Sequence, residues 1–213
     1  WHAKLQLHYT HDGHTTSALD RHEGPLRVLQ RLYPEGPGIC HHVLVHPPGG
    51  IVGGDVLALE AQLEPNCHAL ITTPGATRFY RSEGETSLQQ VHATLADGAR
   101  LEWLPMETIA YSACQAHNRL RFNLAPGAEM IGWDLLALGL PAAGQAFERG
   151  QFLQELELAG AWLERGRIDG GTGNDTLDYR DYTSVHAVIV DLAANSATDV
   201  GSLAGVAGNS SIE

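Results

Sequence analysis

The sequence is poor in several residue types, and each shortage argues against a class of protein. Three cysteines in 213 residues are too few, and odd in number, for a disulfide framework, and they suit a reducing cytoplasm. No apolar run approaches the roughly 18 residues that a membrane-spanning helix needs. Basic residues number 13 against 25 acidic ones, and the net charge of −12 disfavours nucleic acid or an anionic membrane as partner. We therefore expect a cytoplasmic protein.

Catalytic motifs are missing as well. The sequence contains no G-x-S-x-G motif, and nothing links a nucleophile to a base. Glu102 and Glu107 are five residues apart, which places them on opposite faces of a strand rather than together as an acid and base. These absences predict that the protein is not an enzyme.

The dominant pattern is the alternation of apolar and polar residues. It runs through residues 1–9 and returns at 57–63 and 120–124. A period of two is typical of a half-buried strand. Long helical periodicity is absent, and short helices are expected only at 134–138 or 144–148. The sequence thus predicts an all-β fold.

A weak internal repeat predicts how the strands are arranged. Leu63, Leu95 and Leu124 each precede a tight turn and a fresh strand, in "LEPNCHALI", "LADGARLEW" and "LAPGAEMIG". The leucines are spaced by 32 and 29 residues. Pro-Asn, Asp-Gly and Pro-Gly pairs preset one dihedral angle and then permit a positive φ. Repeated units of this kind predict stacked or coiled β-sheets, each unit burying its face against the next.

The stretch "HPPGGIVGGD" has the glycine content of a phosphate-binding loop but not its pattern. A P-loop requires G-x-x-x-x-G-K-[ST] between a strand and a helix. Here an aspartate, which would repel phosphate, follows the second glycine pair and leads into another strand. We interpret the stretch as a hard turn that allows close backbone approach. Its residues are His46, Pro47, Pro48, Gly49, Gly50, Gly53, Gly54 and Asp55.

The sequence "CHHVLVH" holds candidate metal ligands. On an extended strand Cys40 and His42 share one face, and His46 lies on it too, whereas His41 faces the other way. Thiolate and imidazole are ligands for nickel, zinc or copper. His46 is too far along the strand to join the first two at one ion, so further ligands would have to come from a neighbouring strand or a second protomer. The alternative is a buried strand end. We expect at most weak nickel binding at Cys40 and His42.

A second candidate site lies in "TTPGATRFYRSEG". Arg78 and Arg81 bracket Phe79 and Tyr80, and arginines with aromatic residues are common anchors of protein interfaces. An edge strand whose arginines extend over apolar surface explains the same pattern equally well.

Four segments, in order, resemble the urease accessory protein UreD family, which is called UreH in some bacteria. They are "YPEGPGICHHVLVHPPGGIVGGD", "TTPGATRFYRS", "LEWLPMETI" and "GWDLLALGLPAAGQAFERG". The resemblance covers residues 1–169. Met106 departs from it, because the family usually carries glutamine there. Roughly the last third of the family's usual length is missing after "WLERGRIDGG". We therefore expect the chain to be a fragment, because this segment is absent and the sequence starts at Trp1 and ends at "GNSSIE".

The resemblance implies a β-rich scaffold without catalytic activity and without a tightly bound cofactor. Members of the family bind the urease apoprotein and the partner protein UreF, which recruits the GTPase UreG. Nickel then passes transiently from the GTPase to urease. This role agrees with an acidic, histidine-rich chain that lacks a phosphate loop of its own.

From Gly170 the sequence changes character. "GGTGNDTLD" matches the calcium-binding nonapeptide of RTX proteins, in which Asp175 would supply a hard oxygen ligand to Ca²⁺. Residues 170–213 are acidic and resemble a segment of an RTX adhesin. Two explanations are open: a join of unrelated coding sequences, which we favour, or a true fusion. The alternative function is that of a calcium-binding extracellular adhesin fragment.

Overall fold

The computed structural model describes residues 1–170, 176–180, 187–191, 196–198 and 210–211. These residues form nineteen strands and one short 3-10 helix, so the predicted all-β fold is confirmed. No helix in the described part of the chain is long and apolar enough to span a bilayer.

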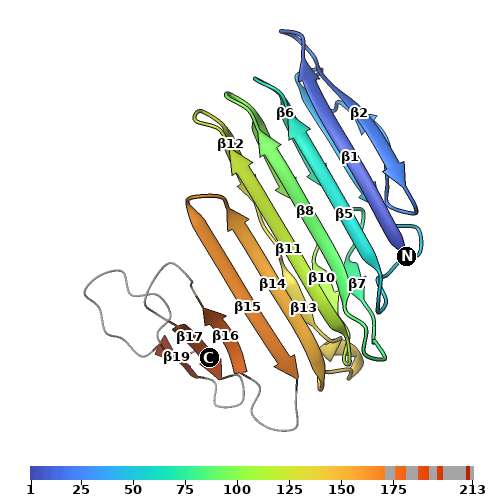
Figure 1. Cartoon of the computed structure of the whole chain (residues 1–213), viewed down its shortest axis with the longest axis vertical. Helices are drawn as coiled ribbons and strands as arrows, with labels where there is room; N and C mark the ends of the chain where they lie inside the picture. Colours follow the sequence, from blue (N-terminus) through green and yellow to red (C-terminus); the bar gives the residue numbers. More distant parts are fainter. Residues whose placement is uncertain (171–175, 181–186, 192–195, 199–209, 212–213) are drawn as a thin grey trace.

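The strands belong to three sheets, of eleven, five and three strands (Figure 1). In spatial order, the large sheet consists of β19 (Ser210–Ser211), β18 (Ser196–Thr198), β17 (Ala187–Asp191), β16 (Thr176–Arg180), β15 (Trp162–Gly170), β14 (Gly150–Leu158), β11 (Gln115–Leu124), β8 (Ser87–Leu95), β5 (Val56–Leu63), β1 (His2–His11) and β2 (Thr16–Glu23). The five-stranded sheet consists of β12 (Glu129–Gly132), β9 (Arg100–Leu104), β6 (His68–Thr72), β4 (Ile39–Val45) and β3 (Arg27–Leu32). The three-stranded sheet consists of β13 (Leu136–Leu138), β10 (Thr108–Ala110) and β7 (Thr77–Phe79).

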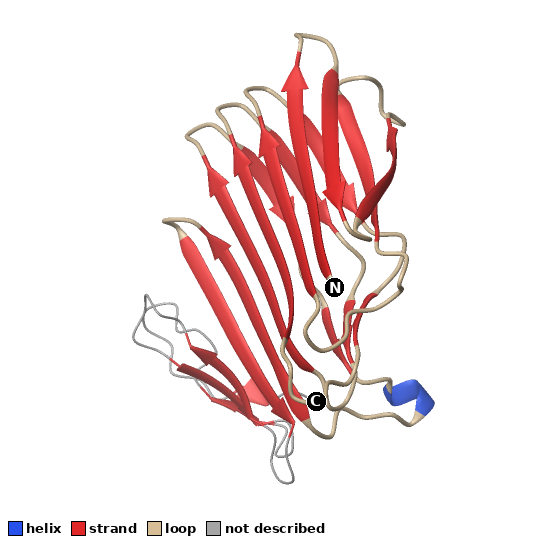
Figure 2. Ribbon diagram, turned by 45° about the vertical axis from the view of Figure 1, so that its right-hand side comes forward, coloured by secondary structure: helices blue, strands red, loops and turns tan. Residues whose placement is uncertain are grey.

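The chain winds through the three sheets in turn, as in a β-solenoid (Figure 2). β5, β6 and β7 form one coil, β8, β9 and β10 the next, and β11, β12 and β13 the third. Equivalent strands of successive coils pair in parallel. After β14 the coiling stops, because β15 turns back and pairs antiparallel with β14.

The three repeated turns stack on one another. Leu95 lies opposite both Leu63 and Leu124 in the sheet, so the leucines of the repeat form a row. The N–H of Ala96 donates to the carbonyl of Leu63 at 3.0 Å, and the N–H of Ala125 donates to that of Leu95 at 2.9 Å. The left-handed position of each turn is held by Asn66, Gly98 or Gly127, with φ of 61°, 68° and 82°. The stacked, coiled arrangement predicted from the repeat is therefore confirmed.

The core lies between the large sheet and the other two. Leu5, Leu59, Val91 and Leu120 lie side by side on β1, β5, β8 and β11, and each is at most 4% exposed. Burial of a leucine or valine contributes about 1.5–3 kcal/mol. Rows of this kind hold successive coils in register, because a slip by one residue would turn every apolar side chain to solvent.

The expected helix at 134–138 is wrong. Leu136–Leu138 is strand β13, which pairs in parallel with β10. The 3-10 helix lies at Pro141–Ala143, between the two expected helical segments. Three or four apolar residues cannot distinguish a buried strand from a helical turn, and here pairing with the preceding coil decides the outcome.

Candidate functional site

The stretch 46–55 links β4 to β5 through two tight turns. The N–H of Gly49 donates to the carbonyl of His46 at 2.8 Å, and the N–H of Asp55 donates to that of Val52 at 3.0 Å. Gly49 and Gly54 have φ of 79° and 81°, values that L-residues rarely adopt. Pro47 and Pro48 are exposed at the first turn. The stretch is therefore a linker between β4 and β5 that contains two tight turns, as its sequence predicts.

The other two glycines allow a second loop to lie against this linker. A Cβ at Gly50 would overlap the ring of Tyr80, and one at Gly53 would overlap the hydroxyl of Ser82. Asp55 is buried, and its Oδ2 accepts from the N–H of Val52 at 3.0 Å. The segments 46–55 and 72–82 therefore pack closely against each other.

The four candidate interface residues do not lie together. Phe79 is fully buried and packs edge-on against Phe152, with ring centroids 5.3 Å apart. The prediction that Phe79 is an interface residue is therefore wrong, because its side chain belongs to the core. Alternation on β7 turns Phe79 into the core, whereas Arg78 is exposed and borders the cavity described below. Tyr80 is 36% exposed and stacks on Tyr111. Arg78 and Arg81 are exposed, and within residues 1–170 neither is in an ion pair.

Cys40 and His42 point inward from β4 and are both fully buried. The hydroxyl of Tyr9 and Nδ1 of His42 form a hydrogen bond of 2.7 Å. Burial lowers the pKa of His42 to about 4 and raises the pKa of the Cys40 thiol. His46 follows the end of β4, and its Nε2 is buried without a hydrogen-bond partner among the described residues. The strand thus brings Cys40 and His42 onto one face, within the core.

We expect weak nickel binding at Cys40 and His42, micromolar or poorer. The thiol resists the deprotonation that a metal requires, and two ligands leave the coordination shell incomplete. Within the described part of the chain, no group of three or more His, Cys, Asp or Glu side chains could hold a metal ion. Calorimetry on the wild type and on the Cys40→Ser/His42→Ala variant measures the effect. Tight stoichiometric binding that the double variant loses would contradict this expectation.

Acidification is expected to destabilise the fold through His42. Its folded-state pKa is about 4, whereas a histidine in an unfolded chain titrates near about 6.5, so the unfolded chain takes up a proton first. The contribution of His42 to stability is fully present above about pH 6.5 and falls by about 3 kcal/mol as the pH drops towards 4. Urea unfolding across this range measures the effect. The variant His42→Gln, which does not titrate, should show a shallower dependence, and equal dependences would contradict the assignment.

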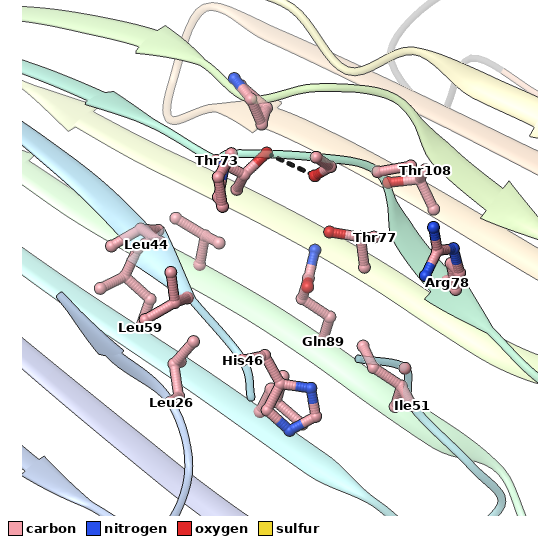
Figure 3. A pocket seen from close by; sticks show the side chains of 18 of the residues that line it. Leu26, Leu44, His46, Ile51, Leu59, Thr73, Thr77, Arg78, Gln89 and Thr108 are labelled. Carbon is pink, nitrogen blue, oxygen red and sulfur yellow. Dashed lines mark hydrogen bonds between the residues drawn. The ribbon is translucent and has the colours of Figure 1, made fainter. Parts of the chain in front are cut away.

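A cavity of about 370 Å³, partly open to solvent, lies between the large sheet and the segments 46–51 and 73–78 (Figure 3). Its walls are largely apolar, with Leu44 and Leu59 among them. Two polar atoms that border it, His46 Nε2 and Trp103 Nε1, are buried without hydrogen-bond partners among the described residues. The volume falls in the range of small-molecule sites.

Polar side chains cross one wall of this cavity. Gln89, Asn118 and Gln154 lie opposite one another on β8, β11 and β14 and point inward. Gln89 donates to Asn118 at 3.1 Å, and Asn118 and Gln154 both donate to Asp134 Oδ2, at 2.7 and 2.9 Å. Burial raises the pKa of Asp134, against the hydrogen bond from Gln154 that lowers it. The ladder joins three strands from the inside, and two of its members, Gln89 and Asp134, line the cavity.

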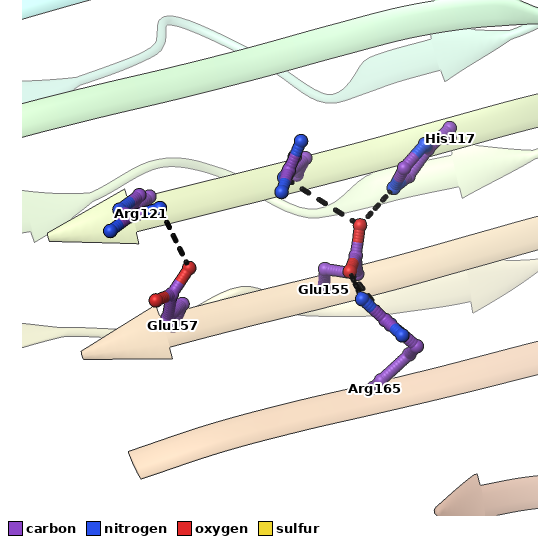
Figure 4. A network of polar contacts seen from close by, with 6 residues as sticks. His117, Arg121, Glu155, Glu157 and Arg165 are labelled. Carbon is purple, nitrogen blue, oxygen red and sulfur yellow. Dashed lines mark hydrogen bonds and ion pairs between the residues drawn. The ribbon is translucent and has the colours of Figure 1, made fainter. Parts of the chain in front are cut away.

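A charged cluster lies on the opposite, outer face of the large sheet (Figure 4). Glu155 on β14 is only 5% exposed, although its neighbours are at the surface. His117 on β11 approaches its Oε2 at 2.6 Å, and Arg165 on β15 donates to its Oε1. Burial alone would raise the pKa of Glu155, but the hydrogen bonds from Arg165 and His117 outweigh it, and the net shift is downward. Our sequence reasoning missed this cluster, although alternate charges in "HNRLRF" and "LQELEL" indicate it.

Comparison with known proteins shows to which family the chain belongs. The model of the family described as UreD urease accessory protein matches residues 2–204. The chain belongs to this family. The UreD protein of Leptothrix cholodnii is 71% identical over 171 residues, which cover 79% of this chain and 62% of that relative. The UreD proteins of Paracidovorax citrulli and Variovorax paradoxus are each 62% identical, over 81% and 79% of this chain and 63% and 61% of theirs.

The chain spans a little over three fifths of the length of these UreD relatives. The UreD match runs to residue 204, past the boundary predicted between residues 169 and 170. In the structure that boundary falls at the end of β15, Trp162–Gly170. Asp175, the predicted calcium ligand, lies outside the described residues. The two-part division of the chain and the calcium site stay predictions.

Proposed function

We propose that this chain acts in urease maturation as a non-catalytic scaffold. It binds the urease apoprotein together with UreF and the UreG-containing complex, and nickel passes to urease as cargo of the assembly. The observation that carries the proposal is the UreD family match over residues 2–204. The relatives are named urease accessory proteins, and a name of that kind describes a helper of another enzyme.

The architecture supports a scaffold role. Equivalent strands of successive coils pair in parallel, and leucine rows and the amide ladder lock the coils together. Rigid stacked coils present extended surfaces to partners, because each coil adds area without changing its neighbours. Arg78, Tyr80 and Arg81 are exposed and stay candidates for such a surface.

Nickel incorporation tests the proposal. The assay uses cells that express urease, UreF and UreG without their own UreD, supplemented with this chain or with residues 1–169 joined to the C-terminal segment of the Leptothrix cholodnii relative. We expect the joined chain to raise the nickel content and activity of urease above those of cells with an empty vector. Equal nickel content with the joined chain and the empty vector would overturn the proposal.

A further inference from the structure

The outer face of the large sheet carries a row of arginines in an otherwise acidic protein. Arg119 and Arg121 point outward from β11 and are about half exposed. Gln90 and His92 on β8 lie opposite them. We call these four residues, with Asn123, the Arg119 face. They border a shallow depression of about 320 Å³ on the sheet surface.

Arg119 has hydrogen-bond donors to spare. Its nearest carboxylate is that of Glu155, with Nε 3.7 Å from Oε2, beyond hydrogen-bond distance. The carboxylate is already held by His117 on one oxygen and Arg165 on the other. A guanidinium presents five N–H donors in a fixed fork. The cluster therefore holds two arginines for one carboxylate, and Arg119 is the one without a hydrogen bond from its guanidinium among the described residues.

The neighbouring charges do not neutralise this surplus. Arg121 lies 3.5 Å from Glu157, and both side chains are partly exposed, so the pair is weak and exchangeable. On the other side of the depression, Glu60 is held by Lys4 at 3.1 Å and by Gln6 at 2.7 Å. Four basic side chains, those of Lys4, Arg119, Arg121 and Arg165, therefore meet three carboxylates, those of Glu60, Glu155 and Glu157, at and beside this face. The local balance is one positive charge, in a chain whose net charge is −12.

We propose that the Arg119 face docks an acidic segment of a partner protein. Arg119 and Arg121 are two residues apart on one strand, and their Cα atoms are separated by about 7 Å. Carboxylates on alternate residues of an extended acidic segment have the same separation, and each guanidinium can bind one of them bidentately. A protein segment fits better than nucleic acid, because the acidic remainder of the chain repels a long polyanion. The inference rests on the charges of this face and stands whether or not the partner is a component of urease maturation.

Binding of a fluorescein-labelled oligoglutamate peptide, measured by fluorescence anisotropy, tests the proposal. We expect binding that weakens with added salt and an affinity at least about tenfold lower in Arg119→Glu/Arg121→Glu. The variant Glu157→Gln should bind about two- to threefold more tightly, because it releases Arg121. The matched control is Arg100→Glu. Arg100 is an exposed arginine on β9 that forms an ion pair with Glu129 at 2.9 Å, and the affinity of this variant for the peptide should stay within about twofold of wild type.

Arg119→Gln provides a second variant that avoids charge reversal, and its affinity should fall between those of the wild type and the double variant. Urea unfolding of each variant verifies that it folds. The proposal is overturned if oligoglutamate does not bind the wild type, or if the arginine variants bind it as the wild type does. It is also overturned if single-stranded DNA of matched length binds as tightly as the peptide, since the face would then bind any polyanion.

Discussion

Replacing Gly150 with alanine is expected to lower the free energy of unfolding by about 3 kcal/mol. Gly150 opens β14 with a φ of 111°, which is strained for any L-residue. A Cβ there would overlap the carbonyl oxygen of Cys114 and lie 2.9 Å from its backbone nitrogen. Backbone atoms cannot rotate away as a flexible side chain can. The start of β14 would have to move, which would strain its pairing with β11 and β15.

Gly160→Ala is the matched control. Gly160 lies between β14 and β15 with a φ of 76°, and no atom lies within 4 Å of the position of its Cβ. Only the intrinsic cost of the left-handed conformation applies, about 1 kcal/mol. Urea unfolding followed by tryptophan fluorescence measures both variants. If Gly150→Ala costs no more than Gly160→Ala, the close approach of β14 to Cys114 is not as the structure has it.

The variant Glu155→Gln is expected to destabilise the fold by about 2 kcal/mol, between the values for exposed ion pairs and for buried ones. Glu155 is nearly buried, whereas His117, Arg119 and Arg165 around it are partly exposed. Glutamine keeps the shape of the side chain but removes the charge, and it directs an N–H₂ group towards donors on His117 or Arg165. The guanidinium groups of Arg119 and Arg165 then repel one another without a shared counter-charge.

The effect of Glu155→Gln should depend on pH. The folded-state pKa of Glu155 is lowered, so its stabilising contribution is fully present above about pH 4.3, its value in an unfolded chain, and is lost as the pH falls through the folded-state pKa. The difference between wild type and variant should therefore shrink in acid. Glu157→Gln, at the looser pair with Arg121, should cost at most about 0.5 kcal/mol. Equal losses in the two glutamine variants would contradict a special role for Glu155.

Local patterns were sufficient to predict the strands and the stacking of coils. The alternation in residues 1–9 indicates that one face of the strand is buried, and the recurring leucine and turn indicate the coil repeat. Both signals can be read from short stretches of sequence, because a strand and a tight turn are each formed by residues that are close along the chain. The division into three sheets did not follow, since three-residue strands such as β7 and β10 leave too short a pattern. Strand β13 was mistaken for a helix for the same reason.

Site residues were harder to predict, because their surroundings come from other coils. The period of two places Cys40 and His42 on one face, but it cannot say that the face is the core. Phe79 resembles an interface anchor until Phe152, 73 residues away, covers it. Glu155 becomes a centre of charge only when β11 and β15 bring His117 and Arg165 to either side of it.

Co-purification with urease apoprotein and UreF tests the central claim most directly. The affinity-tagged chain, and residues 1–169 joined to the C-terminal segment of the Leptothrix cholodnii relative, are each co-expressed with both proteins and analysed by size-exclusion chromatography with light scattering. The account predicts that the joined chain elutes in a stable complex with UreF or the apoprotein, and that Gly150→Ala, which weakens the scaffold, reduces the yield. Elution of the folded, joined chain with neither protein would contradict the account.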